Sequence, residues 1–209
     1  MLIFEEKLFD GASIGVWRLD EELSQLLSFC SKKQKYLSKM EQFLSAQRKR
    51  EWLAVRVLLK QICGEEKEIA YYPSGKPYLA DGSFCISISH TKGYVTVLLH
   101  PTRKVGIDIE QKNERVLTVK HKFLNESEIA NIANECELEQ TLLYWSAKES
   151  VYKLLGIEGV NFSEQLQVKP FVLATQGVLN VQALVSTQTT DYTVHYRFFD
   201  DAVLSWVIV

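Results

Sequence analysis

Two acidic residues stand two positions apart inside a short apolar run, Gly106-Ile107-Asp108-Ile109-Glu110. The β-branched neighbours favour a strand, in which successive side chains point to opposite faces. Asp108 and Glu110 therefore share one face, about 7 Å apart, whereas Ile107 and Ile109 point into a core. Two like charges on a half-buried face repel each other, and they resist desolvation unless a cation lies between them.

This pair of carboxylates has two interpretations. A solvated strand edge would leave both side chains in water and give them no function. A divalent metal would neutralise them, and a site made of oxygen ligands alone favours Mg²⁺ or Ca²⁺ over zinc. Alternation along one strand does not decide between the two, so the other residues of the chain must be considered.

Composition narrows the class of protein. The chain has 209 residues, 46% of them hydrophobic, which is enough for one large domain or two small ones. A net charge of −2 lacks the polybasic signature of nucleic-acid binding. The polar break at residues 101–104 is the best candidate boundary, and it predicts subdomains over residues 1–102 and 103–209.

The spacing of the cysteines and the first residues of the chain indicate the cellular compartment. The cysteines lie far apart and form no CxxC pair, which disfavours both a zinc site and a disulfide framework. The chain starts without a basic segment followed by a long apolar run, and no apolar stretch reaches membrane-spanning length. We therefore expect a cytoplasmic enzyme or binding protein without a membrane or nucleic-acid partner.

The first half of the chain predicts strands and helices in succession. Turn residues Asp10-Gly11 divide two opening strands within residues 2–19, and a short helix is expected over residues 21–29. Apolar residues near helical spacing then predict a long amphipathic helix from about Lys39 to Cys63, capped by Gly64. A strand at residues 69–72 and a hairpin over residues 84–99 complete this half.

Several polar residues of this half have a plain and a functional interpretation. Lysines at residues 32–39 favour a solvated helix face, with an anion-binding rim as the alternative. Lys76 lies between Gly75 and Pro77, so its stiff turn is either a surface accident or a fixed cation beside a phosphate. His90 ends a strand at the mouth of the hairpin, where a structural role is the commoner one and Ser89 raises the odds of function.

The second half predicts a polar, mostly helical stretch at residues 111–140, then a strong helix over residues 140–155. Its apolar stripe would leave Glu149 on the solvated face, with Lys153 as an ordinary i,i+4 partner. Trp145 beside them argues against a wet face. Four strands follow, at residues 166–172, 178–186, 192–198 and 203–209, with turns expected at Gly177 and at residues 200–201.

Set side by side, these motifs resemble those of a known family. They are Gly75-Lys76-Pro77, Ser87-Ile88-Ser89-His90-Thr91, Gly106-Ile107-Asp108-Ile109-Glu110 and Trp145-Ser146-Ala147-Lys148-Glu149-Ser150-Val151-Tyr152-Lys153. In this order and spacing they resemble the Sfp-type 4′-phosphopantetheinyl transferases, and the last motif matches the family pattern throughout. Each motif alone is a weak signal, whereas the ordered set over residues 75–153 is a strong one.

The resemblance implies a fold and a reaction. The fold is α+β, with two similar α/β subdomains related by a pseudo-twofold axis and a coenzyme A site in the cleft between them. In the reaction, the hydroxyl of a serine on an acyl or peptidyl carrier protein attacks the pantetheine-side phosphate of coenzyme A, and 3′,5′-ADP leaves. Such a displacement depends on charge neutralisation and positioning, which Mg²⁺ supplies well.

The resemblance also implies roles for residues of the second half. Asp108, Glu110 and Glu149 would be the metal ligands, directly or through water. Glu149 is also the candidate general base for the carrier serine, a role that depends on its local field. Lys153 would bind the pyrophosphate and assist the leaving group. Asp108, Glu149 and Lys153 are therefore the predicted catalytic residues.

In the first half, the resemblance implies a binding site for the coenzyme A phosphates. Lys76, Ser89 and His90 would contact them. For the 3′-phosphate, Lys39 is the best positional match, with Lys35 and Arg48 as alternatives. A second lysine position of the family falls on Tyr36, so this part of the site departs from the pattern.

The carrier-binding surface of the family follows the metal strand, which here gives residues 112–125. Lys120, Lys122, Phe123 and Leu124 would offer basic and apolar contacts to an acidic carrier. Both half-sites lie in one chain, so we expect a monomer. The runner-up hypothesis is a catalytically inactive module that binds coenzyme A or a carrier protein; it is disfavoured because every residue of the chemistry is present.

Overall fold

The computed structural model describes residues 1–8 and 10–209. The chain divides into two compact units, Met1–Arg103 and Lys104–Val209, and each is described by itself. Phe9, which lies in the segment between the two expected opening strands, is outside the described residues. Both units combine an antiparallel sheet with one long helix, so the fold is mixed α/β.

The first unit contains a sheet of order β1-β2-β6-β5, antiparallel throughout. Its strands are β1 (Leu2–Lys7), β2 (Ser13–Arg18), β5 (Cys85–Thr91) and β6 (Tyr94–His100). Gly93 forms the β5–β6 turn with a φ of 84°, a conformation that favours glycine. The two opening strands and the hairpin expected from the sequence are confirmed.

Helices of the first unit are α1 (Leu23–Ser28), α2 (Lys33–Met40) and α3 (Ala46–Cys63). The single long helix expected from Lys39 is wrong, because it begins at Ala46, where the Ser45 side chain accepts a hydrogen bond from the Arg48 amide. Apolar periodicity continued across the break, which the cap at Ser45 marks. Gly64 ends α3 with a φ of 76°, as expected.

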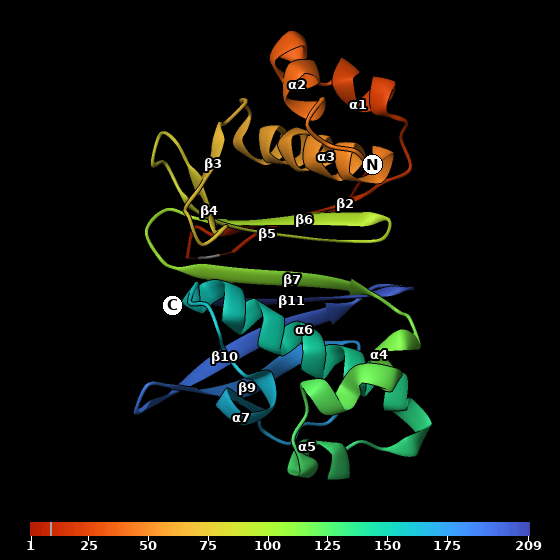
Figure 1. The fold of residues 1–209 in the computed structure, drawn as a ribbon, viewed down its shortest axis with the longest axis vertical. Helices are drawn as coiled ribbons and strands as arrows, with labels where there is room; N and C mark the ends of the chain where they lie inside the picture. The colour runs from red at the N-terminus through yellow and green to blue at the C-terminus, as the bar shows by residue number, and fades with distance from the viewer. Residues whose placement is uncertain (9) are drawn as a thin grey trace. The chain divides into compact units, whose positions relative to one another are not determined.

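The long helix α3 lies along one face of this sheet, against β2 and β6 (Figure 1). Gly15 on β2 permits the contact, since a Cβ there would lie 2.8 Å from side-chain atoms of Leu58 and Ile62. A separate two-stranded sheet is formed by β3 (Ile69–Tyr71) and β4 (Pro77–Leu79). The turn between these strands carries Lys76.

The second unit contains an antiparallel sheet of order β7-β11-β10-β9-β8. Its strands are β7 (Val105–Gln111), β8 (Leu166–Val168), β9 (Gln176–Val185), β10 (Gln188–Phe198) and β11 (Ala202–Ile208). The turn expected at Gly177 is wrong, because this residue lies inside β9. A Cβ there would come within 3.1 Å of the Tyr196 hydroxyl, so the glycine makes room for that ring.

Helix α6 (Glu137–Leu155) lies along this second sheet, against β7 and β11 (Figure 1). Its expected apolar stripe, Leu143, Ala147, Val151 and Leu154, is buried as predicted. Gly106 brings helix and strand together, since a Cβ there would lie 2.0 Å from the Ser150 carbonyl oxygen. The backbone of α6 therefore rests directly on β7.

Short helical segments connect β7 to α6 and α6 to β8. They are α4 (Arg115–Val119), the 3-10 turns η1 (Lys120–Lys122) and η2 (Asn134–Cys136), α5 (Glu126–Ala130) and α7 (Phe162–Gln165). Asn125 begins α5, because its side chain and that of Glu128 form a reciprocal capping box. None of the helices in the described part of the chain has the length and apolar character that crossing a bilayer requires.

Candidate functional site

Asp108 and Glu110 lie on the face of β7 that meets α6. The Lys153 ammonium donates to Asp108 Oδ1 at 2.7 Å, and the Trp145 indole N–H donates to Glu110 Oε1 at 2.8 Å. Ile107 and Ile109 on the opposite face are fully buried, so the predicted alternation is confirmed. Two turns of α6 and one strand thus bring together the Lys153 ammonium, the Trp145 indole and these carboxylates.

The solvated face expected for Glu149 is wrong. Trp145, Glu149 and Lys153 are only partly exposed, and they lie on the side of α6 that faces the carboxylates of β7. Polar residues of the same helix, such as Ser146 and Ser150, are fully buried. Burial surrounds this helix on nearly all sides, so the polarity of its residues does not reveal which side meets water.

The carboxylates of this cluster perturb one another. Burial, and then the Asp108 charge, raise the pKa of Glu110 to about 7, although the hydrogen bond from Trp145 and the Lys153 charge oppose the shift. Burial and Asp108 likewise raise the pKa of Glu149 to about 7, against the opposing charge of Lys153. Asp108 acts on both glutamates, so the three carboxylates share one local field.

The assignment of Asp108, Glu110 and Glu149 as metal ligands stays a prediction. Among the residues that the structure describes, no group of three or more Asp, Glu, His or Cys side chains forms a ready-made metal cluster. The Lys153 ammonium contacts one oxygen of Asp108. The donor chemistry nevertheless fits a hard divalent cation, because the candidates are all carboxylates and a cation would relieve their mutual repulsion.

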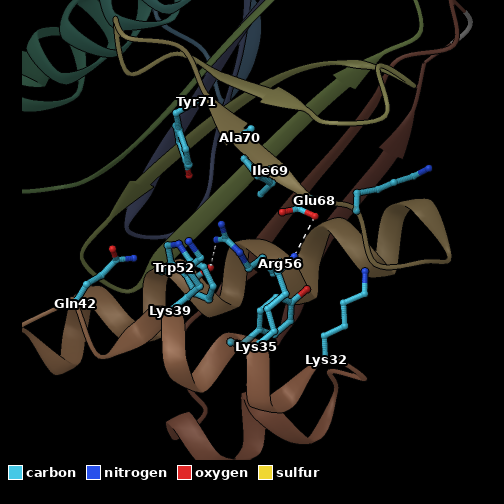
Figure 2. A pocket seen from close by; sticks show the side chains of 12 residues that line it. Lys32, Lys35, Lys39, Gln42, Trp52, Arg56, Glu68, Ile69, Ala70 and Tyr71 are labelled. Atoms are coloured by element: carbon cyan, nitrogen blue, oxygen red, sulfur yellow. Dashed lines mark hydrogen bonds and ion pairs between the residues drawn. The ribbon is translucent and has the colours of Figure 1, made fainter.

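A basic cavity of about 340 Å³ lies in the first unit, between α2, α3 and β3 (Figure 2). Lys35 and Lys39 of α2, and Lys32 just before this helix, line it opposite residues 68–71, which include β3. The interpretation of residues 32–39 as an anion-binding rim therefore gains support over a plain solvated face. The lining residues are Lys32, Lys35, Tyr36, Lys39, Gln42, Trp52, Arg56, Lys67, Glu68, Ile69, Ala70 and Tyr71.

Cations dominate the field of this cavity. Lys35 pairs with Glu68 at 3.0 Å and lowers the pKa of that carboxyl, and the charges of Lys32 and Lys39 lower it further. On α3, the Arg56 guanidinium lies 3.3 Å from the centre of the Trp52 ring. A cavity with several cations and a large aromatic ring suits an anionic ligand that also has an aromatic or apolar part.

A second cavity, of about 200 Å³, shares Trp52, Arg56 and Tyr71 with the first. Its polar lining includes Arg48 and His90, whose Nη1 and Nε2 atoms are in direct contact. Glu51 Oε2 lies 3.5 Å from His90 Nδ1. Since a guanidinium can only donate, Nε2 accepts and Nδ1 carries the proton that faces Glu51.

Two of the predicted phosphate contacts, Ser89 and Lys76, are not among the residues that line the two cavities. His90 lies inside β5, paired with Val95, and Ser89 beside it points to the opposite face of the strand and is nearly fully buried. Lys76 lies in the β3–β4 turn after Gly75, whose φ is 80°, and the Lys76 carbonyl accepts from the Tyr72 amide. The roles of Ser89 and Lys76 in binding stay predictions.

One part of the expected carrier surface needs correction. Phe123 and Leu124 are buried in the core of the second unit, so they cannot offer apolar contacts to a partner. Lys120 pairs with Glu137, whereas Lys122 is exposed and Val119 is 38% exposed. The apolar residues of this short polar segment pack into the core instead of facing solvent.

Sequence reasoning missed several residues of the first unit. Trp52, Arg56 and Tyr71 line both cavities, and Glu51 lies against His90. The spacing of Trp52 and Arg56, one turn apart on a basic helix, was the available signal. Tyr71 belongs to β3, which follows α3 in the chain, so only the tertiary structure brings it next to Trp52 and Arg56.

Comparison with known proteins adds two findings. Residues 104–207, nearly the whole second unit, match the model of the 4′-phosphopantetheinyl transferase superfamily. The chain is also 27% identical over 175 residues to a phosphopantetheinyl transferase of Thraustochytrium sp., a match that covers 71% of this chain and 60% of that protein. The chain thus spans less than two thirds of this relative. These matches show that the chain is similar to phosphopantetheinyl transferases, with the family-model match confined to residues 104–207.

Proposed function

We propose that this chain, whose second unit matches the 4′-phosphopantetheinyl transferase superfamily, modifies carrier proteins in a Mg²⁺-dependent reaction. It would transfer the 4′-phosphopantetheine group of coenzyme A to a serine hydroxyl of an acyl or peptidyl carrier protein. The observation that carries the proposal is the cluster of Asp108, Glu110, Glu149 and Lys153 within the matched residues 104–207. A monomeric, cytoplasmic enzyme with the Sfp-type arrangement of subdomains remains part of the prediction.

The carboxylates of β7 and α6 are the residues that would hold the metal. Asp108, Glu110 and Glu149 supply oxygen ligands only, which Mg²⁺ prefers. When bound, Mg²⁺ would neutralise charge on the pyrophosphate and on the surrounding carboxylates. Trp145 holds one oxygen of Glu110, so its second oxygen is oriented by the same hydrogen bond.

Glu149 is suited to accept the proton of the carrier serine. In the absence of a metal, burial and the Asp108 charge raise the pKa of Glu149 to about 7, and its basicity during the reaction depends on whether it binds Mg²⁺ directly or through water. The serine oxygen forms a bond to the pantetheine-side phosphorus, and the bond from that phosphorus to the bridging oxygen breaks. The electron pair leaves with 3′,5′-ADP, where the Lys153 ammonium would stabilise the developing charge.

The cavities of the first unit are the proposed binding site for the phosphates of coenzyme A. Lys35 and Lys39 line the larger one together with Arg56, so these cations are the candidates for the 3′-phosphate. The Arg48–His90 pair lines the smaller one and offers a second anion contact. Trp52 borders both cavities and gives the nucleotide an apolar surface.

The carrier protein would contact the segment that follows β7. Lys122 and Val119 are exposed there, and a basic surface with a limited apolar part suits an acidic partner. The buried Phe123 and Leu124 would act only by holding this segment in place.

The direct test is the mass of an apo carrier protein after incubation with the chain, coenzyme A and Mg²⁺. The expected result is one phosphopantetheine adduct per carrier, lost when EDTA replaces Mg²⁺ and when Asp108 is changed to Asn. Carriers from fatty-acid, polyketide and peptide synthesis should all be tried. Coenzyme A binding without an adduct on any of them would contradict the enzyme and leave an inactive binding module.

A further inference from the structure

Lys148 is a fully buried lysine in the middle of α6, and the reaction proposed above does not use it. Its ammonium donates to Glu128 Oε2 at 2.7 Å, to the Phe123 carbonyl at 2.7 Å and to the Phe162 carbonyl at 3.1 Å. An ammonium group has three donors, so these contacts satisfy it completely. The side chain is therefore held in one position by three separate segments of the second unit.

Stability alone explains this ion pair poorly. Glu128 is also buried, at 1% exposure, and taking two charges out of water costs much of what their attraction returns. Burial lowers the pKa of Lys148, and the neighbouring Glu128 opposes the shift. Apolar side chains of the same volume often serve a core as well as such a pair does. The pair must therefore be considered for what it holds in place.

The carbonyls that Lys148 binds belong to two aromatic residues whose rings both pack against one tryptophan. The Phe123 ring centre lies 4.9 Å from that of Trp145, and the Phe162 ring centre lies 5.5 Å from it. Trp145 in turn donates its indole N–H to Glu110 at 2.8 Å. Each step of this path is a direct contact within the second unit, from Lys148 to the Glu110 carboxylate.

We propose that Lys148 is a positioning residue for Glu110. Its ammonium fixes the backbone at Phe123 and Phe162, the two rings fix the Trp145 indole, and the indole holds the Glu110 carboxylate. The inference rests on the proposed function only in giving Glu110 a use as a metal ligand. The path of contacts itself stands independently of that use.

Glu128 completes the anchor on the other side of Lys148. Its Oε1 accepts from the Val168 amide at 2.8 Å, and its Oε2 accepts from the Asn125 amide at 3.0 Å as well as from Lys148. Removing only the lysine would leave a buried carboxylate without its cation, which can unfold a protein. The test therefore uses Lys148→Met and also the double variant Lys148→Met/Glu128→Gln, in which both charges are absent.

The first measurement follows the indole N–H of Trp145 by NMR without any metal. The chain has four tryptophans, and Trp145→Phe identifies the signal of Trp145 by its loss. In the unaltered protein this proton should exchange slowly with solvent. Lys148→Met, or the double variant, should shift the signal and speed its exchange. The matched control is Leu143→Ala, which removes a fully buried side chain from the same helix and should leave the signal in place.

The second measurement is the apparent Mg²⁺ affinity, taken from the rise in melting temperature with Mg²⁺ concentration. Lys148→Met and Trp145→Phe should each weaken it about 10-fold, the usual effect of losing a group that orients a metal ligand. Because both act on the same carboxylate, combining them should weaken it no further. Losses that multiply would contradict the path through Trp145.

The two measurements separate this inference from the proposed function. If Lys148→Met lowers stability as Leu143→Ala does and leaves the Trp145 signal unchanged, Lys148 only stabilises the fold and the inference is wrong. If the signal responds while the unaltered protein shows no Mg²⁺ effect, the positioning role is retained and the metal part of the proposed function is lost.

Discussion

The two units of this chain use charge in opposite ways. In the first unit, cations surround open cavities, and the Lys35–Glu68 pair has side chains that are 47% and 58% exposed. In the second unit, charges are packed into the protein: the side chains of the Lys148–Glu128 pair are 0% and 1% exposed, and Asp108 is nearly as buried. Exposed pairs contribute little and are screened by salt, whereas buried ones are costly and strictly placed.

This difference matches two tasks that a group-transfer enzyme must perform. A long, flexible anionic substrate can be held by several cations, none of which needs an exact position. Proton transfer and charge stabilisation at the reacting bond need groups that are already oriented when the reaction begins. We therefore expect substitutions in the first unit to change affinity and substitutions in the second unit to change turnover.

The largest effect should come from Glu149→Gln. Loss of the proposed base should reduce single-turnover modification of a carrier by about 10²–10⁴-fold, while coenzyme A affinity changes little. The rate is measured from the mass of the carrier over time. Glu158→Gln is the matched control, because Glu158 is an exposed carboxylate just beyond the same helix. Near-normal turnover in Glu149→Gln would remove Glu149 from both the metal and the base assignments.

Lys153→Met tests the cation of the cluster. Losing a charge aimed at the leaving group should lower kcat by about 10²–10³-fold, with a smaller change in the KM for coenzyme A. Steady-state kinetics with varied coenzyme A separates the two constants. A rise in KM with kcat preserved would make Lys153 a binding residue, and the contrast between the units would then fail at this position.

Lys39→Ala tests the opposite expectation for the first unit. Removing one charged contact to a phosphate should raise the KM for coenzyme A by about 10-fold and leave kcat unchanged. Added salt should raise the KM of the unaltered protein in the same way, because it screens exposed charges. Lys33→Ala, on the same helix but outside the cavity lining, is the control and should have no effect. A fall in kcat for Lys39→Ala would contradict the expectation that substitutions in the first unit change affinity and not turnover.

How far the sequence predicted this molecule also differs between the units. In the second unit, alternation placed Asp108 and Glu110 on one face, and the structure confirms that face. Periodicity misplaced Glu149, because α6 is buried on nearly all sides and its polar residues face other protein atoms. Gly106 lets the helix approach the strand because it has no Cβ. A close approach of this kind leaves no periodic pattern in the sequence from which it could be predicted.

In the first unit, the sequence indicated basic residues without showing where they meet. Lys35 and Lys39 come from α2 and Arg56 from α3, and the helix expected from Lys39 begins only at Ala46, so the cavity lies between two separate helices. Tyr71 arrives from β3. A cavity assembled from separate elements depends on tertiary packing, whereas a strand face depends on local alternation alone.

The pH dependence of stability should show how much the buried carboxylates of the second unit destabilise the folded protein. Glu110 and Glu149 have folded-state pKa values raised from 4.5 to about 7, so the folded protein retains protons that the unfolded chain releases. Their contribution to stability is therefore full below about pH 4.5 and is lost as pH rises to about 7, by about 1–3 kcal/mol per carboxylate.

Urea unfolding in EDTA at about pH 5 and about pH 8 measures this loss. Glu110→Gln should reduce the difference between the two pH values, because an amide does not titrate, and it should stabilise the metal-free protein at the higher pH. Mg²⁺ should restore stability to the unaltered protein at the higher pH. If Glu110→Gln left the pH dependence unchanged, burial of this carboxylate would not carry the cost assigned to it.

The smallest expected effect compares one helix cap from each unit. Ser45 Oγ accepts from the Arg48 amide at a long 3.4 Å, so Ser45→Ala should cost about 0.5 kcal/mol of stability. The Asn125 side chain accepts from the Glu128 amide at 2.9 Å, so Asn125→Ala should cost about 1–2 kcal/mol, although the Asn125 backbone amide would still donate to the Glu128 carboxylate. Urea unfolding gives both values.

The two caps should also differ in what they disturb beyond stability. Because the Asn125 side chain accepts from the Glu128 amide, its loss should move Glu128, reach Lys148 and change the Trp145 indole signal, whereas Ser45→Ala has no such path among the described contacts of its own unit. Equal costs for the two caps, together with an unchanged indole signal, would mean that the buried charges of the second unit are no more tightly ordered than the exposed charges of the first. From the shorter hydrogen bond at Asn125, we expect the second unit, which is proposed to orient Glu110, to have the stronger of the two caps.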